Sequence, residues 1–235
     1  PDRGEETQDS HPVSVWRRSA ESEGRRRVPR SARLSPVPSA PMTRLLVVRH
    51  GQSEWNATGR WQGRADPPLT DEGRRQANVA GGALGAFDAV VASPLLRAAE
   101  TATIIAEKLG IGPVLTDSDL MERDAGEWQG LTRDQIQEEW PGFLDDGNRP
   151  PGYEPGDAML ARVLSALERI AERMGDGEVL VVSHGGVVYA LEEACGEPWI
   201  RLPNLSARWF EFSGGDLSAG PRVELVPGGT VPNLL

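Results

Sequence analysis

The stretch that decides the fold is Leu-Leu-Val-Val-Arg-His-Gly at residues 45–51. Its first four residues form a short apolar run, and such a run predicts a buried strand. The run ends directly in Arg49, His50 and Gly51, so side chains that can carry chemistry stand at the carboxyl end of the strand.

Two further apolar runs, at 89–92 and 179–182, end in the same way. The residues that follow them are Ser93, Pro94 and Arg97 in the first case, and Ser183, His184 and Gly185 in the second. Ligands of open α/β sheets bind at the carboxyl ends of the strands. We therefore expect two histidines and two arginines, far apart in the sequence, to converge on one edge of a sheet.

The segments between these strands have helical patterns. Helices are predicted from Thr70 to about Leu84, from Ser93 and Pro94 to Leu109, over 157–174, and from Gly185 onward. Further predictions are strands at 114–115, 207–212 and 222–226, a short helix after Thr132, and a loop over 141–156. The alternation of strand and helix predicts an α/β protein with a mostly parallel sheet and helices on both faces.

Length and composition exclude several classes of protein. A chain of 235 residues can bury the core of one α/β domain, and 38% apolar residues is ordinary for a globular protein. No run approaches the roughly 18 apolar residues that a membrane span needs, so no membrane partner is expected. Cys195 is the only cysteine, which excludes an internal disulfide and favours a reducing, cytoplasmic location.

The charge is distributed unevenly along the chain. Residues 1–41 carry eight arginines and six acidic residues, whereas 42–235 carry seventeen basic and twenty-nine acidic residues. The acidic body argues against a nucleic-acid partner, because duplex binding requires cations that neutralise phosphates. Residues 1–41 are rich in Pro and Ser and are predicted to be a disordered leader, with Met42 a candidate start of a domain over 42–235.

The residue types at the expected sheet edge suit a phosphoryl group. An arginine offers a planar fork of donors to phosphate oxygens, and a neutral imidazole can attack phosphorus when its other nitrogen donates to a carbonyl. Gly51 and Gly185 would let the backbone approach the ligand closely. Glu122 follows the third predicted strand, so it would lie near the same edge and could protonate a leaving group. Asp124 is the rival for that role.

Several ordered motifs resemble the histidine phosphatase superfamily, the phosphoglycerate mutase-like family, over about residues 43–195. They are Arg49-His50-Gly51-Gln52-Ser53-Glu54-Trp55-Asn56, Trp61-Gln62-Gly63, Pro68-Leu69-Thr70-x-x-Gly73, Ser93-Pro94-x-x-Arg97-Ala98, Glu122-x-x-x-Gly126-x-Trp128 and Ser183-His184-Gly185-Gly186. The resemblance implies a three-layer α/β/α sandwich and a site without a metal or cofactor. The segment Gly-Tyr-Glu-Pro at 152–155 departs from the family's usual Gly-Glu-Ser, so no role is assigned to Glu154.

The resemblance also implies roles for individual residues. His50 would be the nucleophile that becomes phosphorylated, and Glu122 would be the proton donor that later activates water. The phosphoryl group would be clamped by Arg49, Arg97 and His184, and further substrate-binding positions would be Gly51, Ser53, Asn56, Gln62, Gly63 and Gly185.

The predicted function is a metal-independent phosphatase that hydrolyses a small phosphorylated metabolite. A bisphosphoglycerate-dependent mutase is the alternative; it is less favoured because only thirty-one residues separate Glu122 from Glu154, where mutases carry a longer insertion. Two other hypotheses are a non-catalytic phosphate-binding domain and a metallohydrolase, the latter disfavoured because neither histidine has an acidic residue at ligand spacing. The oligomeric state stays open, with a homodimer as one option.

Some residues have an alternative interpretation. Arg60 and Arg64 could steer anionic substrates or could simply belong to an exposed loop. Cys195 follows an apolar helical run and is interpreted as a packing residue rather than a nucleophile.

Overall fold

In the computed structural model of the chain, residues 41–227 are described, and 1–40 and 228–235 are not. The predicted leader therefore lies, except for residue 41, outside the described residues. The strands are β1 (Thr43–Arg49), β2 (Ala89–Ala92), β3 (Leu115–Thr116), β4 (Glu178–Ser183), β5 (Ser206–Ser213) and β6 (Asp216–Glu224). The α-helices are α1 (Glu54–Ala57), α2 (Asp71–Ala83), α3 (Leu96–Leu109), α4 (Arg133–Glu139), α5 (Phe143–Asp146), α6 (Gly156–Met174) and α7 (Gly185–Ala194).

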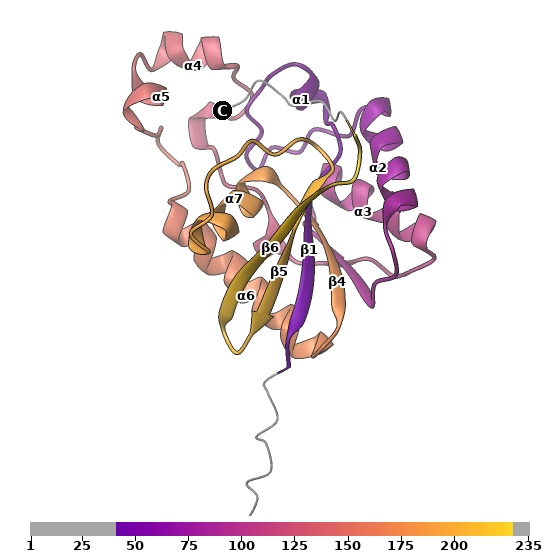
Figure 1. Cartoon of the computed structure of the whole chain (residues 1–235). Helices are drawn as coiled ribbons and strands as arrows, with labels where there is room; N and C mark the ends of the chain where they lie inside the picture. Colours follow the sequence, from indigo (N-terminus) through magenta and orange to yellow (C-terminus); the bar gives the residue numbers. More distant parts are fainter. Residues whose placement is uncertain (1–40, 228–235) are drawn as a thin grey trace, which may run out of the picture. The chain divides into compact units, whose positions relative to one another are not determined.

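The strands form one sheet in the order β3-β2-β4-β1-β5-β6 (Figure 1). The first four strands run parallel, whereas β5 and β6 are antiparallel additions at one side. In the register of β1 and β4, Arg49 stands opposite Ser183, so these two strands end level with each other. The prediction of a mostly parallel sheet is confirmed, and the carboxyl ends of its central strands meet at one edge.

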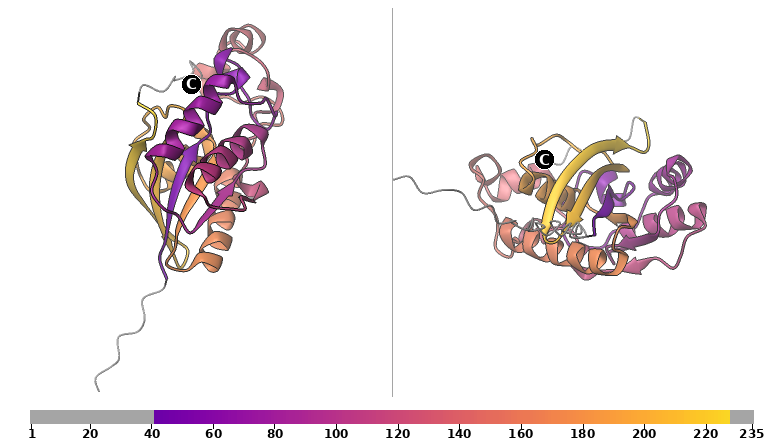
Figure 2. Two further views of the ribbon diagram at one scale, coloured as in Figure 1. Left: turned by 90° about the vertical axis from the view of Figure 1, so that its right-hand side faces the viewer. Right: turned by 60° about the horizontal axis from the view of Figure 1, so that its bottom comes forward.

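Helices cover both faces of the sheet, as an α/β/α sandwich requires (Figure 2). The side chains of β1 alternate between the two faces. Leu45 and Val47 pack in one core cluster with α6 and α7, and Leu46 and Val48 pack in the other with α2 and α3. The two cores hold the sheet between helical layers and leave its carboxyl edge for the loops that carry the site.

Side-chain caps place several of the helices as predicted. The hydroxyl of Thr70 accepts a hydrogen bond from the amide of Gly73 at 3.0 Å and so begins α2. Thr132 and Gln135 form a reciprocal capping box before α4. Each such cap is worth about 1 kcal/mol of stability.

Other element boundaries differ from the predictions. Helix α3 begins at Leu96, not at Pro94, because the backbone of Leu95 is extended, and the amide of Leu96 donates to Oδ1 of Asp66 at 2.7 Å. The predicted loop over 141–156 contains the short helix α5, and the short helix α1 was not predicted.

The last strand also begins earlier than predicted. Gly214 and Gly215, with φ of 59° and 91°, allow a tight turn, so β6 pairs with β5 from Asp216 onward. Residues 216–221 include Asp, Ser, Gly and Pro, which are depleted in strands, so the sequence does not reveal this edge strand. No helix within residues 41–227 has the length and apolar character to cross a bilayer.

Candidate active site

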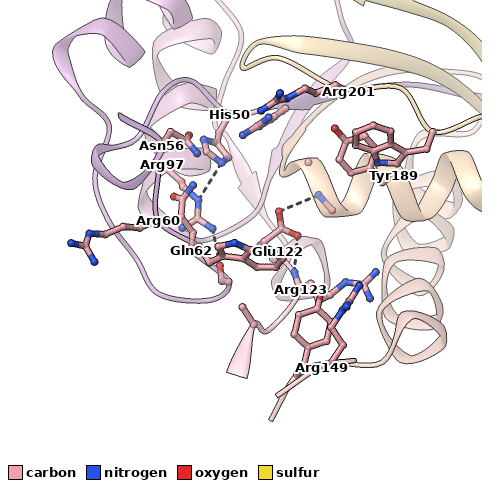
Figure 3. Close-up of a pocket in the computed structure, with 18 of the residues that line it drawn as sticks. His50, Asn56, Arg60, Gln62, Arg97, Glu122, Arg123, Arg149, Tyr189 and Arg201 are labelled. Carbon is pink, nitrogen blue, oxygen red and sulfur yellow. Dashed lines mark hydrogen bonds between the residues drawn. The ribbon is translucent and has the colours of Figure 1, made fainter. Parts of the chain in front are cut away.

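The carboxyl edge of the sheet brings together the four residues that sequence reasoning placed there. Arg49 and His50 follow β1, Arg97 lies in the first turn of α3, and His184 lies between β4 and α7. The rings of His50 and His184 are edge-on, with centroids 5.2 Å apart. A cavity of about 380 Å³ opens at this edge: Arg49, His50 and Arg97 line it (Figure 3), whereas His184 is fully buried beside His50 and does not line it.

The hydrogen bonds of His50 define its tautomer. Its Nε2 accepts a hydrogen bond from Nε of Arg97 at 3.2 Å, so Nε2 carries no proton. Its Nδ1 then holds the proton and donates it to the carbonyl of Gly51 at 2.6 Å. The unprotonated nitrogen therefore lies next to Arg97 in the wall of the cavity, which both residues line, and the bond from Nδ1 to the carbonyl fixes the ring as a nucleophilic imidazole requires.

The surroundings of His50 also keep it neutral. Burial lowers the pKa of His50 well below its usual 6.5, and the positive charges of Arg97 and Arg49 lower it further. Since the side chain is 2% exposed, little water is present to stabilise an imidazolium. A neutral imidazole keeps its lone pair at physiological pH.

His184 is held by a hydrogen bond between its Nε2 and the hydroxyl of Ser93, 2.8 Å away. The same hydroxyl accepts a hydrogen bond from the amide of Leu95 at 3.3 Å. Nδ1 of His184 is buried and has no hydrogen-bond partner within residues 41–227. Burial, followed by the charges of Arg97 and His50, lowers the pKa of His184 well below 6.5.

Arg97 is a fully buried cation held by the backbone. Its two terminal nitrogens donate to the carbonyls of Ala65 at 2.8 Å and Gly63 at 2.9 Å, while its Nε meets His50. Burial lowers the pKa of Arg97 to about 10, which still leaves it charged at neutral pH. Gly63, a predicted substrate-binding residue, lines the cavity and also positions this guanidinium.

Arg49 points toward the start of α7. One of its terminal nitrogens donates to the carbonyl of Leu202, whereas its buried Nε has no hydrogen-bond partner among residues 41–227. A Cβ added to Gly185 would lie 3.7 Å from that Nε, so the two residues are close neighbours in the cavity wall. An oxyanion in the cavity would satisfy a donor that the protein leaves unpaired.

Glu122 faces the same cavity from the loop after β3. Its carboxylate accepts hydrogen bonds from the amides of Arg123 at 2.7 Å and Gly186 at 3.1 Å. Gly186 must be glycine for this approach, since a Cβ there would collide with the carboxylate. The rival acid, Asp124, instead accepts a bond from the amide of Gly126 and does not line the cavity.

Two predicted substrate-binding residues do not reach the cavity. Ser53 is fully buried as the cap of α1, and its hydroxyl donates to Oε1 of Gln62 at 2.7 Å. Gly51 packs against α2 instead of a ligand, because a Cβ there would lie 2.6 Å from the carbonyl oxygen of Gly73. Ser53 and Gly51 therefore support the cavity wall, whereas Asn56 and Gln62 line it as predicted.

The sequence reasoning missed several residues of the site. Asn204 is buried before β5 and donates to the carbonyl of His50 at 2.9 Å and to Oδ1 of Asn56 at 3.2 Å, which ties these residues together. A lone asparagine among apolar residues was the available signal. Other lining residues that were not singled out include Arg123, Arg149, Tyr153, Tyr189 and Arg201. Trp199, for which the sequence favoured packing over ligand stacking, is exposed and lines the cavity.

Arg60 and Arg64, whose role the sequence left open, lie in different surroundings. Arg60 lines the cavity, although one of its nitrogens donates to the carbonyl of Gly130. Arg64 does not line it and pairs with Glu154 at 3.1 Å. Glu154 also receives two nitrogens of Arg162, at 2.7 and 2.8 Å. Partial burial alone would raise the pKa of Glu154, but the bonds to Arg162 outweigh it and lower the pKa.

Comparison with known proteins identifies the family. A family profile described as the histidine phosphatase superfamily (branch 1) matches residues 45–218. The chain belongs to this superfamily. The match covers both histidines, both arginines and Glu122, and within residues 41–227 no three His, Cys, Asp or Glu side chains gather where they could hold a metal ion.

The relatives of this histidine phosphatase superfamily member include both mutases and phosphatases. Phosphoglycerate mutase-like protein 4 of Arabidopsis thaliana is 39% identical over 186 residues, which are 73% of this chain and 80% of the relative. A 2,3-bisphosphoglycerate-dependent phosphoglycerate mutase of Methylobacterium radiotolerans is 38% identical over 183 residues, 71% of this chain and 86% of the relative. A mycobacterial glucosyl-3-phosphoglycerate phosphatase, solved in complex with VO3, matches with a TM-score of 0.67 and 31% identity over 75% of this chain and 96% of that one.

Proposed function

We propose that this enzyme is a metal-independent phosphatase that hydrolyses a small phosphomonoester through a phosphohistidine on His50. The observation that carries the proposal is the state of His50: it is neutral, its Nδ1 is held by a carbonyl, and its Nε2 lies next to Arg97 in the wall of a cavity lined by guanidinium groups. A site that only binds phosphate would not need an unprotonated histidine nitrogen next to buried arginines.

The first half of the reaction transfers the phosphoryl group to the enzyme. Nε2 of His50 attacks phosphorus, a P–N bond forms, and the P–O bond to the leaving group breaks. Glu122 in its protonated form gives its proton to the departing oxygen. Nε of Arg49 and, in the tautomer protonated there, Nδ1 of His184 would donate to the equatorial oxygens, where negative charge is concentrated; neither atom has a hydrogen-bond partner within the described part of the chain.

The second half returns the enzyme to its starting state. The Glu122 carboxylate takes a proton from a water molecule, the water oxygen attacks phosphorus, and the P–N bond breaks. Inorganic phosphate leaves, and His50 regains its lone pair. Arg97 must release Nε2 of His50 while the phosphoryl group is attached, and its two backbone-held nitrogens keep the guanidinium in place during that change.

The bound VO3 of the mycobacterial relative supports this chemistry, because vanadate resembles the phosphoryl group in shape and charge. The mutase relative favours a second candidate, in which the phosphoryl group returns to substrate instead of water. Release of inorganic phosphate without formation of an isomeric phosphate ester distinguishes a phosphatase from a mutase when a phosphoglycerate is supplied.

The proposal predicts that His50→Ala abolishes turnover of p-nitrophenyl phosphate, with a loss of roughly 10³-fold or more, because the attacking atom is gone. Phosphate release is the measurement, and Glu107→Gln on the exposed side of α3 is the control that should retain activity. A chelator should not lower the rate. Unchanged turnover in His50→Ala would refute the proposed nucleophile, and a chelator-induced loss that zinc restores would refute the metal-independent reaction.

A further inference from the structure

The cavity contains more positive charge than one phosphomonoester needs. Its lining includes six arginines and two carboxylates: Arg49, Arg60, Arg97, Arg123, Arg149 and Arg201, with Glu122 and Glu193. Without Arg201, which interacts with another group, these leave three formal positive charges, one more than a phosphomonoester dianion neutralises. The whole chain has a net charge of −10, so these arginines gather in the cavity although the protein is acidic overall.

Part of this excess lies away from His50, on the loop before α6. The guanidinium of Arg149 lies 5.3 Å from the ring centre of Tyr153, and that of Arg123 lies 5.6 Å from the same ring. Arg149 also lies 5.7 Å from the buried ring of Trp128. In Figure 3, Arg123 and Arg149 gather on one side of Glu122, and His50 and Arg97 lie on the other.

Arg149 keeps most of its donors available. Its one hydrogen bond to the protein goes to the carbonyl of the neighbouring Asn148, at 2.7 Å, and it pairs with no carboxylate within residues 41–227. Stacking on an aromatic ring uses the face of a guanidinium and leaves the N–H groups at its edge free. Other arginines of the described chain differ: Arg162 and Arg169, for instance, each bind carboxylates directly.

The loop that presents Arg149 is anchored to the segment that carries Glu122. Tyr153 forms an isolated β-bridge with Ala125. The amide of Glu154 donates to the carbonyl of Asp124 at 2.9 Å, and the amide of Glu127 donates to the carbonyl of Pro151 at 3.3 Å. Pro150, next to Arg149, is buried. The cation is thus held at the cavity by backbone contacts, so little ordering is required when it meets a ligand.

We infer that Arg149, stacked on Tyr153 and Trp128, selects phosphomonoesters that carry a second anionic group, a carboxylate or a phosphate, and binds that group. The inference rests on the proposed function, since the reacting phosphoryl group occupies the site at His50. The second anion would point from the reacting group past Glu122 toward the Arg149 side of the cavity. A neutral substrate of the same length would leave this cation without its partner.

Matched substrates test the inference. 3-Phosphoglycerate and glycerol 3-phosphate differ by a carboxylate in place of a hydroxymethyl group, and 1,3-propanediol bisphosphate differs from its monophosphate by the second phosphate. We expect kcat/KM to be about tenfold higher for the doubly anionic member of at least one pair. Preference in the first pair alone identifies a carboxylate as the recognised group, and preference in the second pair alone identifies a phosphate.

The variant Arg149→Ala should reduce that preference about tenfold, which corresponds to about 1.4 kcal/mol. Arg149→Lys should restore part of it, because the charge returns without the planar fork. Arg75→Ala removes the same charge from the exposed side of α2 and should leave the preference as it is in the wild type. A merely structural role of Arg149 would change both members of a pair alike and leave their ratio constant.

The outcomes separate this inference from the proposed function. His50-dependent hydrolysis of p-nitrophenyl phosphate with no preference in either pair would overturn the inference and retain the phosphatase. A preference that survives Arg149→Ala would also overturn it, since another residue would then bind the second anion. Absence of His50-dependent hydrolysis of every substrate would refute the proposed function itself.

Discussion

The floor and the rim of the cavity are built in different ways. The floor, defined as Arg49, His50, Arg97 and His184, is buried except for the half-buried Arg49, and it is held by the ends of strands and by hydrogen bonds to backbone carbonyls and to Ser93. The rim, defined as Arg123, Arg149 and Tyr153, is partly or fully exposed and is held by aromatic stacking on a loop. A buried, rigid floor suits a reaction common to many substrates, whereas an accessible rim suits selection among them.

The difference predicts that changes in the floor affect all substrates, while changes in the rim affect some. Arg97→Lys should lower kcat by roughly 10²–10³, because lysine cannot reproduce the three directed bonds of the guanidinium. Rates measured on aryl and alkyl phosphates, with and without a second anion, should fall by the same factor. A loss confined to one class of substrate would contradict the claim that the floor serves all substrates alike.

Glu122 lies between the floor and the rim, and its replacement should affect substrates according to their leaving group. Glu122→Gln should slow alkyl phosphates by about 10²-fold, since an alkoxide needs a proton in order to leave. The first step of p-nitrophenyl phosphate hydrolysis should change much less, because the nitrophenolate departs without a proton. Single-turnover rates of phenolate or alcohol release measure this, and equal losses on both substrates would remove Glu122 from the acid role.

A smaller effect concerns stability at acid pH. The pKa values of His50 and His184 are lowered in the folded protein, so between pH 6.5 and those values the unfolded chain binds protons that the folded chain does not. The free energy of unfolding should therefore fall as the pH falls from 6.5 to 5.5, by up to about 1 kcal/mol per histidine. Urea denaturation at the two pH values tests this.

The same titration separates the floor from the rim. Arg149→Ala should leave the dependence of stability on pH as it is in the wild type, whereas His184→Asn should reduce it by about half. A wild-type protein whose stability does not change between pH 6.5 and 5.5 would contradict the buried, neutral state of the two histidines.

The floor could be predicted from the sequence because strand ends constrain it strongly. The apolar runs pair in parallel, which brings together their ends and the residues that follow them: Arg49, His50 and His184. Arg97 lies in the first turn of the helix that follows another of these strands. Glu122 could be placed near the same edge by the strand before it. These positions depend on local pattern and on a general property of α/β sheets.

The rest of the site depends on tertiary contacts that leave no local pattern. Ser93 looked like a helix cap, yet its hydroxyl bonds to His184, a residue 91 positions away. Ser53 looked like a ligand of the substrate, yet it caps α1 and orients Gln62. Arg149 lies in a loop rich in Pro, Gly and Asp, and no pattern in the sequence indicates that it stacks on Tyr153.

The measurement that tests the account most directly is the capture of the phosphorylated enzyme. Glu122→Gln supplied with radiolabelled p-nitrophenyl phosphate should form the intermediate readily but hydrolyse it slowly, since water activation is impaired. Quenching during turnover should yield one phosphoryl group per enzyme, stable to alkali and labile to acid, and mapped to His50. Absence of a protein-bound phosphoryl group during turnover, or its presence on a residue other than His50, would contradict the account.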